Sequence, residues 1–346
     1  MQAAPSAHNR DPLSIDLALQ GGGAHGAFTW GVLDRLLEEP WLHIAGISGT
    51  SAGAMNAAVL VHGHSVSGNL GARSALEDFW RRVSDAGRFS PVQRGPIDIL
   101  LGRWTLDNSL AWVAVDIMSR LFSPYDLHLG EWNPLRNILT EVIDFERVAQ
   151  SPIKLFITAT NVATGRARVF RNREITGEVL IASACLPTMF QAIEIDGDAY
   201  WDGGYSGNPT ITPLVRETAS QDTIIIPINP IERKGTPRAA SDILNRLNEV
   251  AFNAVLLKEL RMIALLRRVA DPGHEEGERW SKMRVHSVSN EVMTKLSASS
   301  KLIVEWDFLC MLRDKGRRSA QAFLKRSIDD LGRRSTLDLD VLLKGV

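Results

Sequence analysis

The sequence predicts a three-layer α/β fold, with a mostly parallel central sheet and helices on both faces. Short apolar or β-branched runs alternate with segments whose apolar residues recur at helical spacing, which is typical of such folds. The runs that predict strands are residues 15–19, 42–48, 153–161 and 223–229. Helical spacing between the first two runs is seen at Phe28, Val32, Leu36 and Leu37. Ligand sites in these sheets form beyond the carboxyl ends of the strands.

Length and composition are those of an ordinary globular protein. The chain has 346 residues, of which 45% are apolar and 23% are charged, and it can hold one large α/β domain or two small ones. Its 39 Lys and Arg nearly balance its 40 Asp and Glu, so bulk charge favours no nucleic-acid partner. Between Glu39 and Arg73 there is no charged residue, and this stretch predicts a buried strand and a buried helix.

Two glycine-containing loops follow the first two predicted strands, and each precedes a helical pattern. The first reads QGGGAHG over residues 20–26, and the second reads GTSAG over residues 49–53. In the second loop, Gly49 and Gly53 flank Ser51 in a G-x-S-x-G pattern. This pattern places a serine on a sharp strand-to-helix turn with its hydroxyl accessible. The sequence therefore predicts Ser51 as a nucleophile.

A serine nucleophile requires a site that stabilises the oxyanion formed during attack. The first loop predicts that site, because amides at a helix N-terminus point outward without partners. We expect the amides of Gly22, Gly23 and Ala24 around the oxyanion.

The nucleophile also requires a base, and the candidate is Asp202. Gly203 and Gly204 follow it directly, and two glycines allow a tight turn that another segment can approach closely. An aspartate in this setting can meet Ser51 and accept its proton.

Three motifs in this order resemble those of the patatin-like phospholipases. They are Gly21-x-Gly23-x-x-Gly26, Gly49-x-Ser51-x-Gly53 and Asp202-Gly203-Gly204. The segment 181–187, followed by Phe190, and the turn through Asn208 and Pro213 are also similar to this family. The resemblance extends from about residue 13 to about residue 229.

The resemblance implies a lipid acyl hydrolase with a patatin-like fold, a Ser-Asp dyad and no catalytic histidine. It implies that Ser51 is the nucleophile, that Asp202 is the proton acceptor, and that Gly21 to Ala24 form the oxyanion hole. No metal and no organic cofactor are implied. One position departs from the family, which usually has Arg or Lys where this chain has His25. A fixed positive charge is then missing, and we expect activity to depend on pH through this histidine.

Other interpretations of the same residues stay open. The first loop alone fits a dinucleotide-binding fingerprint, although the second strand leads into the serine turn instead of an acidic residue. Ser51 alone fits a helix N-cap, and Asp202 alone fits a turn aspartate. A Ser-His-Asp triad would use His274, in an acidic loop, or His286, in a run that predicts a strand.

The cysteines and the remaining histidines predict no further chemistry. Cys185 and Cys310 lie far apart and form no C-x-x-C pattern, and the histidines show no metal-binding spacing. We therefore expect free thiols, no structural disulfide and no metal site.

The expected organisation has three parts. Residues 1–12 form a flexible N-terminal segment, residues 13–230 form the catalytic domain, and residues 231–346 form a helical extension packed on it. A helical insert at about residues 77–131 is rich in large apolar groups and is the candidate for acyl-chain selection; Phe79, Trp80, Trp104 and Trp112 belong to it. In the extension, we expect the helical stretch 306–324 to break near Gly316.

Residues 1–12 contain no apolar segment typical of a secretory signal. We expect a cytoplasmic protein, with peripheral contact at membranes left open. The expected partner is a lipid ester and not a nucleic acid, and the sequence does not indicate whether a protein activator is required. Two other functions share these features: an acyltransferase that uses the same acyl-enzyme, and a lipid-binding protein whose dyad is vestigial. Phospholipid, lysophospholipid, glyceride and simple ester substrates all fit this chemistry.

Overall fold

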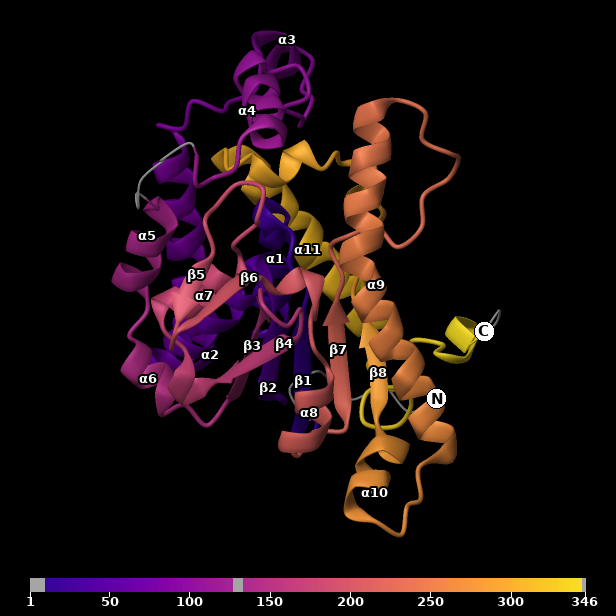
Figure 1. The fold of residues 1–346 in the computed structure, drawn as a ribbon. Helices are drawn as coiled ribbons and strands as arrows, with labels where there is room; N and C mark the ends of the chain where they lie inside the picture. The colour runs from indigo at the N-terminus through magenta and orange to yellow at the C-terminus, as the bar shows by residue number, and fades with distance from the viewer. Residues whose placement is uncertain (1–9, 127–132, 344–346) are drawn as a thin grey trace.

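A mixed sheet of eight strands forms the centre of the molecule (Figure 1). The computed structural model describes residues 10–126 and 133–343. The strand order is β5-β6-β3-β2-β1-β7-β8, and β4 pairs with β3 outside this path. The strands are β1 (Leu13–Leu19), β2 (Leu42–Gly49), β3 (Lys154–Asn161), β4 (Ala167–Arg171), β5 (Ile193–Ile195), β6 (Asp198–Asp202), β7 (Asp222–Ile226) and β8 (Arg284–Ser287). The pairs along β3-β2-β1-β7-β8 are parallel, which confirms the predicted mostly parallel sheet.

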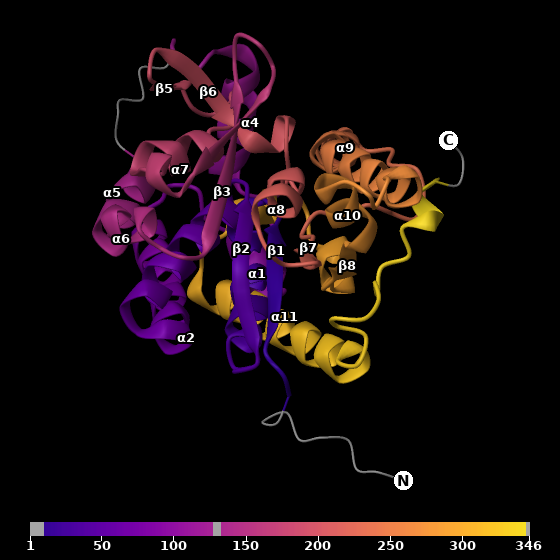
Figure 2. The same ribbon diagram turned by 90° about the horizontal axis from the view of Figure 1, so that it is seen from below.

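The strands separate two hydrophobic cores, one on each face of the sheet. In β7, Ile224 and Ile226 enter the larger core and Ile225 enters the smaller one, because successive side chains of a strand point to opposite faces. The larger core includes α1 (Gly26–Leu36), α2 (Ala52–Gly87) and α11 (Trp306–Ser327). The smaller core includes α8 (Thr212–Glu217), α9 (Ala240–Val269) and α10 (Glu275–Lys282). Figure 2 shows these two helical layers on opposite sides of the sheet, and the predicted three-layer architecture is confirmed.

Shorter elements complete the described chain. Helices α5 (Pro134–Val142), α6 (Phe145–Ala149) and α7 (Gly177–Ser183) also contribute to the larger core. The 3-10 helices are η2 (Gly23–His25), η3 (Asn172–Glu174), η4 (Gly203–Tyr205), η5 (Glu291–Lys295), η6 (Ser299–Leu302) and η7 (Asp340–Leu343). Among the described residues, no helix combines the length and the apolar character that crossing a membrane requires.

Helix α11 crosses α1 at very short range. A side chain at Gly316 would meet the carbonyl oxygen of Phe28, and a side chain at Gly31 would meet that of Arg313. Glycine at the crossing point removes these clashes, so that the two backbones come into contact. The predicted break near Gly316 is therefore wrong, since α11 is continuous from Trp306 to Ser327 and the glycine serves the crossing.

The helical insert begins later than the sequence predicted. Helix α2 continues to Gly87 after a change of direction at Ser67 and Gly68, and Phe79 and Trp80 in its second half are buried in the larger core. The apolar content of residues 77–87 thus reflects packing. The insert proper contains α3 (Pro96–Leu100) and α4 (Leu110–Leu121), and the last residues of the predicted range, 127–132, lie outside the described residues.

The C-terminal extension is mostly helical and shares the sheet with the preceding part of the chain. It contributes the edge strand β8, which pairs in parallel with β7, as well as α9, α10 and α11. Since the extension supplies material to both cores, we propose that residues 13–230 and 231–346 fold as one cooperative unit.

Candidate active site

Ser51 lies on the turn between β2 and α2 in an unusual backbone conformation. Its φ is 54° and its ψ is −123°, in a region that non-glycine residues rarely adopt. Its amide donates a hydrogen bond of 2.9 Å to Oγ of Ser183, whose hydroxyl in turn donates one of 2.7 Å to the carbonyl of Thr158. Ser183 therefore holds the strained turn against β3. The side chain of Ser51 makes no capping hydrogen bond to α2, which disfavours a purely structural N-cap.

Asp202 ends β6 and comes to the same point from the other side of β3. Its side chain is buried, and it accepts a hydrogen bond of 2.7 Å from the amide of Gly204. The Ser51 side chain lies close enough to this carboxyl group to lower its pKa. The structure thus brings the predicted nucleophile and the predicted base close together, although 151 positions separate them in the sequence.

Burial controls the ionisation of Asp202. Desolvation raises its pKa to about 7, while the hydrogen bonds from Gly204 and Ser51 and the charge of Lys301 lower it. The carboxylate is consequently a much stronger base than an aspartate in water, which titrates near pH 4. Near neutral pH it can both accept and return a proton.

The glycine loop packs directly on the serine turn. A side chain at Gly21 would overlap Cβ of Ser51 and the carbonyl oxygen of Thr50, so the contact requires glycine. The Gly21 amide donates a 2.7 Å hydrogen bond to Oδ1 of Asn208, and the Gly21 carbonyl accepts a 2.8 Å bond from Nδ2 of Asn229. Because its amide is already engaged, Gly21 fixes the loop in place and does not have a free donor for an oxyanion.

The next three amides of the loop are differently placed. Gly22, Gly23 and Ala24 donate no backbone hydrogen bond to any residue that the structure describes, and they lie at the start of η2, which leads into α1. Amides at such a helix N-terminus favour an anion. The predicted oxyanion site therefore narrows from four residues to these three.

A polar network that the sequence did not reveal orients the glycine loop. Oε1 of Gln20 accepts hydrogen bonds of 2.8 Å from the amides of Ile228 and Asn229, and its Nε2 donates one of 2.9 Å to Asn253 on α9. All these side chains are buried. No local motif distinguishes Gln20, Asn229 or Asn253, because their role arises only when β1, β7 and α9 come together.

His25, which departs from the resemblance, is buried and neutral. Its Nε2 shares a 2.7 Å hydrogen bond with Oγ of Ser300. Burial, followed by the charges of Lys301 and Arg233, lowers the pKa of His25 well below its usual value. His25 therefore stays neutral around neutral pH, and the expected pH dependence through this residue finds no support.

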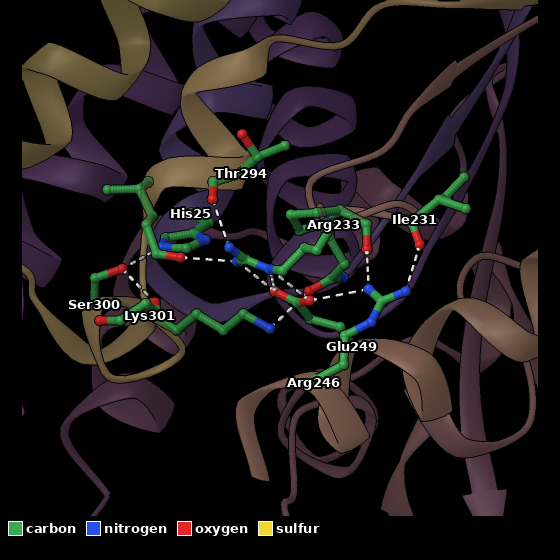
Figure 3. Close-up of polar contacts among 12 residues, drawn as sticks. His25, Ile231, Arg233, Arg246, Glu249, Thr294, Ser300 and Lys301 are labelled. Atoms are coloured by element: carbon green, nitrogen blue, oxygen red, sulfur yellow. Dashed lines mark hydrogen bonds and ion pairs between the residues drawn. The ribbon is translucent and has the colours of Figure 1, made fainter. Parts of the chain in front are cut away.

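Lys301, from the C-terminal extension, lies beside the glycine loop together with Ser300 (Figure 3). Its Nζ donates a 2.6 Å hydrogen bond to Oδ1 of Asn229. Burial lowers the pKa of Lys301 to about 8, against the opposing influence of Glu249 and Asp202. No sequence pattern indicates a role for Lys301, which lies outside the region of family resemblance.

The insert is joined to the same segment of the extension. The Leu106 amide donates a 3.1 Å hydrogen bond to Oγ of Ser299. The Trp104 ring lies 4.9 Å from that of Phe308, which lies 6.3 Å from the His25 ring. The insert therefore lies close to the glycine loop, and Figure 1 shows α3 and α4 beyond the end of the sheet toward which β7 points.

The two histidines of the alternative triad lie elsewhere. His286 on β8 shares a 3.0 Å hydrogen bond with Asp222 through Nε2, and His274 is exposed at the start of α10. In the described part of the chain, no histidine hydrogen-bonds to Ser51 or Asp202. Nor does this part contain a group of three or more His, Cys, Asp or Glu that could hold a metal ion.

The sequence and the fold are similar to those of known proteins, and the sequence match identifies the family. The model of the patatin-like phospholipase family matches residues 17–215, more than half of the chain. Among solved structures, the chain is similar to VipD from Legionella pneumophila at 16% identity and a TM-score of 0.40, over 92% of this chain and 67% of that chain. It is also similar to a chain of the heterodimeric ExoU-SpcU complex from Pseudomonas aeruginosa at 16% identity and a TM-score of 0.30, over 96% and 74% of the two chains. No curated protein matches significantly. On the strength of the family match, the chain belongs to the patatin-like phospholipases, which are hydrolases of lipid esters.

Proposed function

We propose that the protein cleaves carboxylic esters of lipids through a dyad of Ser51 and Asp202. The observation that carries this proposal is the strained turn that holds Ser51 beside the Asp202 carboxyl group, whose pKa the Ser51 side chain lowers. A serine so placed has its hydroxyl available for attack, and the adjacent base can activate it.

The reaction has two halves. Asp202 accepts the proton of the Ser51 hydroxyl as Oγ attacks the ester carbonyl carbon, and the tetrahedral intermediate then expels the alcohol, which takes the proton from Asp202. The resulting acyl-enzyme is attacked by a water molecule whose proton goes to Asp202. Collapse releases the fatty acid and returns the proton to Ser51.

The amides of Gly22, Gly23 and Ala24 are assigned to the oxyanion in both halves. They are free of partners among the described residues and lie on the loop that packs against Ser51. Donors fixed before the reaction stabilise developing charge without the cost of reorganisation.

The insert is assigned to the acyl chains and to the lipid surface. Helices α3 and α4 expose many large apolar side chains, with exposed fractions of 85% at Leu100 and 88% at Leu110. An exposed apolar surface of this kind marks a site of interaction, and amphipathic helices with such faces rest on the boundary of a bilayer. The partner proposed here is a lipid surface that presents the ester.

The test compares wild-type protein with Ser51→Ala and Asp202→Asn on a short-chain nitrophenyl ester and on phosphatidylcholine vesicles. Matched controls are Asp85→Asn, at an exposed carboxylate on α2, and His274→Ala. We expect loss of turnover in the first two variants and retention in the controls. A fluorophosphonate probe should label wild type at Ser51 and leave Ser51→Ala unlabelled.

Three other outcomes would replace the proposal. Retained turnover in Asp202→Asn with loss in a histidine variant would establish a triad. Formation of new ester from added lysolipid or glycerol, at the expense of free acid, would establish an acyltransferase. Wild-type protein that neither turns over esters nor reacts with the probe would be a lipid-binding protein with a vestigial dyad.

A further inference from the structure

The glycine loop carries no positive charge of its own. Residues 20–26 include neither Lys nor Arg, and the one ionisable side chain among them, His25, has its pKa lowered by burial and by two neighbouring cations. The negative charge of the reaction lies on the buried Asp202 carboxylate before attack and on the oxyanion beside Ser51 after it. Burying either charge without a compensating group is unfavourable.

A cation close to the loop comes from the C-terminal extension. Nζ of Lys301 donates a 2.6 Å hydrogen bond to Oδ1 of Asn229, and Nδ2 of the same amide donates a 2.8 Å bond to the carbonyl of Gly21. One side-chain amide therefore connects the ammonium group to the glycine loop. The ammonium also lies 5.8 Å from the centre of the Phe252 ring, which packs against Gly204 next to Asp202.

Two carboxylates, Glu249 and Asp202, raise the pKa of Lys301, but neither is joined to it by a direct ion pair among the described residues. Glu249, the carboxylate of the adjacent helix α9, is already paired with Arg233 at 2.6 Å and Arg246 at 3.2 Å (Figure 3). Within the described part of the chain, Lys301 forms no ion pair. A partly buried ammonium group without a directly paired carboxylate is unfavourable. A negative charge nearby, such as the Asp202 carboxylate or the oxyanion, would compensate for this cost.

The backbone around Lys301 is also fitted to the loop. A side chain at Gly23 would meet the carbonyl oxygen of Lys301, and the preceding residue, Ser300, bonds to His25. The segment is further held by Arg233, which donates a 3.0 Å hydrogen bond to the carbonyl of Leu296.

We propose that Lys301 is a positioning residue of the active site, whose ammonium group holds the glycine loop through Asn229 and supplies the positive charge that stabilises the Asp202 carboxylate and the oxyanion. This inference rests on the proposed ester hydrolysis by Ser51 and Asp202. It assigns an essential part of the site to the C-terminal extension.

The test replaces Lys301 by Met, which removes the charge and keeps a long side chain, and by Arg, which keeps the charge. Lys295→Met, at an exposed position on η5, is the matched control. For the short-chain ester, we expect Lys301→Met to lower kcat roughly 10- to 100-fold, as for a unit charge acting through partly shielded protein. KM should stay unchanged because Lys301 acts through other groups, and Lys295→Met should behave as wild type.

The pH profile separates an electrostatic role from a structural one. The charged or titratable groups around Lys301 are Asp202 on β6, Glu249 on α9, Arg233 after β7 and His25 on η2. Wild-type kcat should rise as Asp202 loses its proton near pH 7 and fall as Lys301 loses its own near pH 8. In Lys301→Met the alkaline fall should disappear and the acidic rise should move to higher pH. In Lys301→Arg kcat should be largely retained and the alkaline fall should also disappear, because arginine stays protonated.

A wild-type kcat and pH profile in Lys301→Met, together with an inactive Ser51→Ala, would overturn the inference and leave the dyad intact. Full activity in Ser51→Ala would instead overturn the proposed function. If Lys301→Met does not fold, the alkaline limb of Lys301→Arg decides: a fall near pH 8 that persists in this variant contradicts the assignment.

Discussion

Two buried aspartates lie at opposite ends of the sheet and differ in their partners. Asp222, at the amino end of β7, accepts hydrogen bonds from Arg284 at 2.7 Å and from the amide of Gly332 at 2.9 Å, and it shares one of 3.0 Å with His286. Asp202, at the carboxyl end of β6, accepts a hydrogen bond from the Gly204 amide and lies near the Ser51 side chain, which lowers its pKa. Among the described residues, Asp202 forms no ion pair.

Their acidities differ accordingly. Burial raises the pKa of Asp222, but the hydrogen bonds from His286 and Arg284 outweigh it and hold the pKa at about 2. Burial also raises the pKa of Asp202, and its fewer partners leave it at about 7. One carboxylate is stabilised as a permanent anion, and the other is kept reactive near neutral pH. Incomplete stabilisation of a buried group is typical of functional sites.

The largest expected effect separates the two aspartates by activity. Asp202→Asn should lower kcat by roughly three orders of magnitude or more, as for other members of a catalytic unit. Asp222→Asn should leave kcat per folded molecule within about twofold, because Asp222 does not contact the site. The measurement is hydrolysis of a short-chain ester, corrected for active enzyme by fluorophosphonate titration. An equal loss of kcat in the two variants would show that a change at Asp222 affects the active site at the other end of the sheet.

The next largest effect is on stability, where Asp222→Asn and not Asp202→Asn should show the loss. Asp222→Asn should lower the free energy of unfolding by about 3 kcal/mol, since it leaves the buried Arg284 pair broken. Asp202→Asn should leave it unchanged or raise it by about 1–3 kcal/mol at pH 8, because a desolvated charge is removed. Urea titration of both variants and of wild type measures these differences. A strongly destabilised Asp202→Asn would mean that Asp202 is chiefly structural.

The pH dependence of stability should also have opposite signs. Asp202 has a folded pKa above its unfolded value, so its protonated form favours the fold, and this contribution is lost as pH rises from about 4 through about 7. Asp222 has a folded pKa below its unfolded value, so its contribution is present above about pH 4 and is lost as pH falls toward about 2. Urea midpoints at pH 3, 5 and 8 test both trends. Asp202→Asn should abolish the loss of stability toward high pH that Asp202 causes, and Asp222→Asn should abolish the loss toward low pH that Asp222 causes.

The smallest effect concerns apolar residues that are exposed instead of buried. Leu110→Asp and Leu121→Asp, at exposed positions on α4, should change the free energy of unfolding by less than about 0.5 kcal/mol. Short-ester hydrolysis should be unchanged, and hydrolysis of phosphatidylcholine vesicles should fall several-fold because contact with the lipid surface weakens. A vesicle-binding assay by co-flotation checks the cause. Unchanged binding and turnover would remove the insert from the proposed lipid surface.

Sequence reasoning succeeded for the fold where the determinants are local. The strands and the turn and loop that follow β2 and β1 came from short patterns, since each pattern specifies its own backbone geometry. The catalytic roles of Ser51 and Asp202 stay predictions. It failed where tertiary contacts decide: Gly316 suggested a helix break but serves a helix crossing, and the insert was predicted to include Phe79 of α2. Ser183, Asn229 and Lys301 could not be assigned, because nothing near them in the sequence indicates what they will face.

The crossing of α1 and α11 bears on which part of the chain can fold by itself. The match of the family model ends at residue 215, yet α1, the helix that follows the glycine loop, packs backbone against backbone on α11, which starts at Trp306. The segment matched by the family model, residues 17–215, is therefore shorter than the segment that we expect to be needed for folding. A fragment that ends at residue 215 would expose one side of α1 and lack β7 and β8 of the sheet. We therefore expect that such a fragment does not fold by itself.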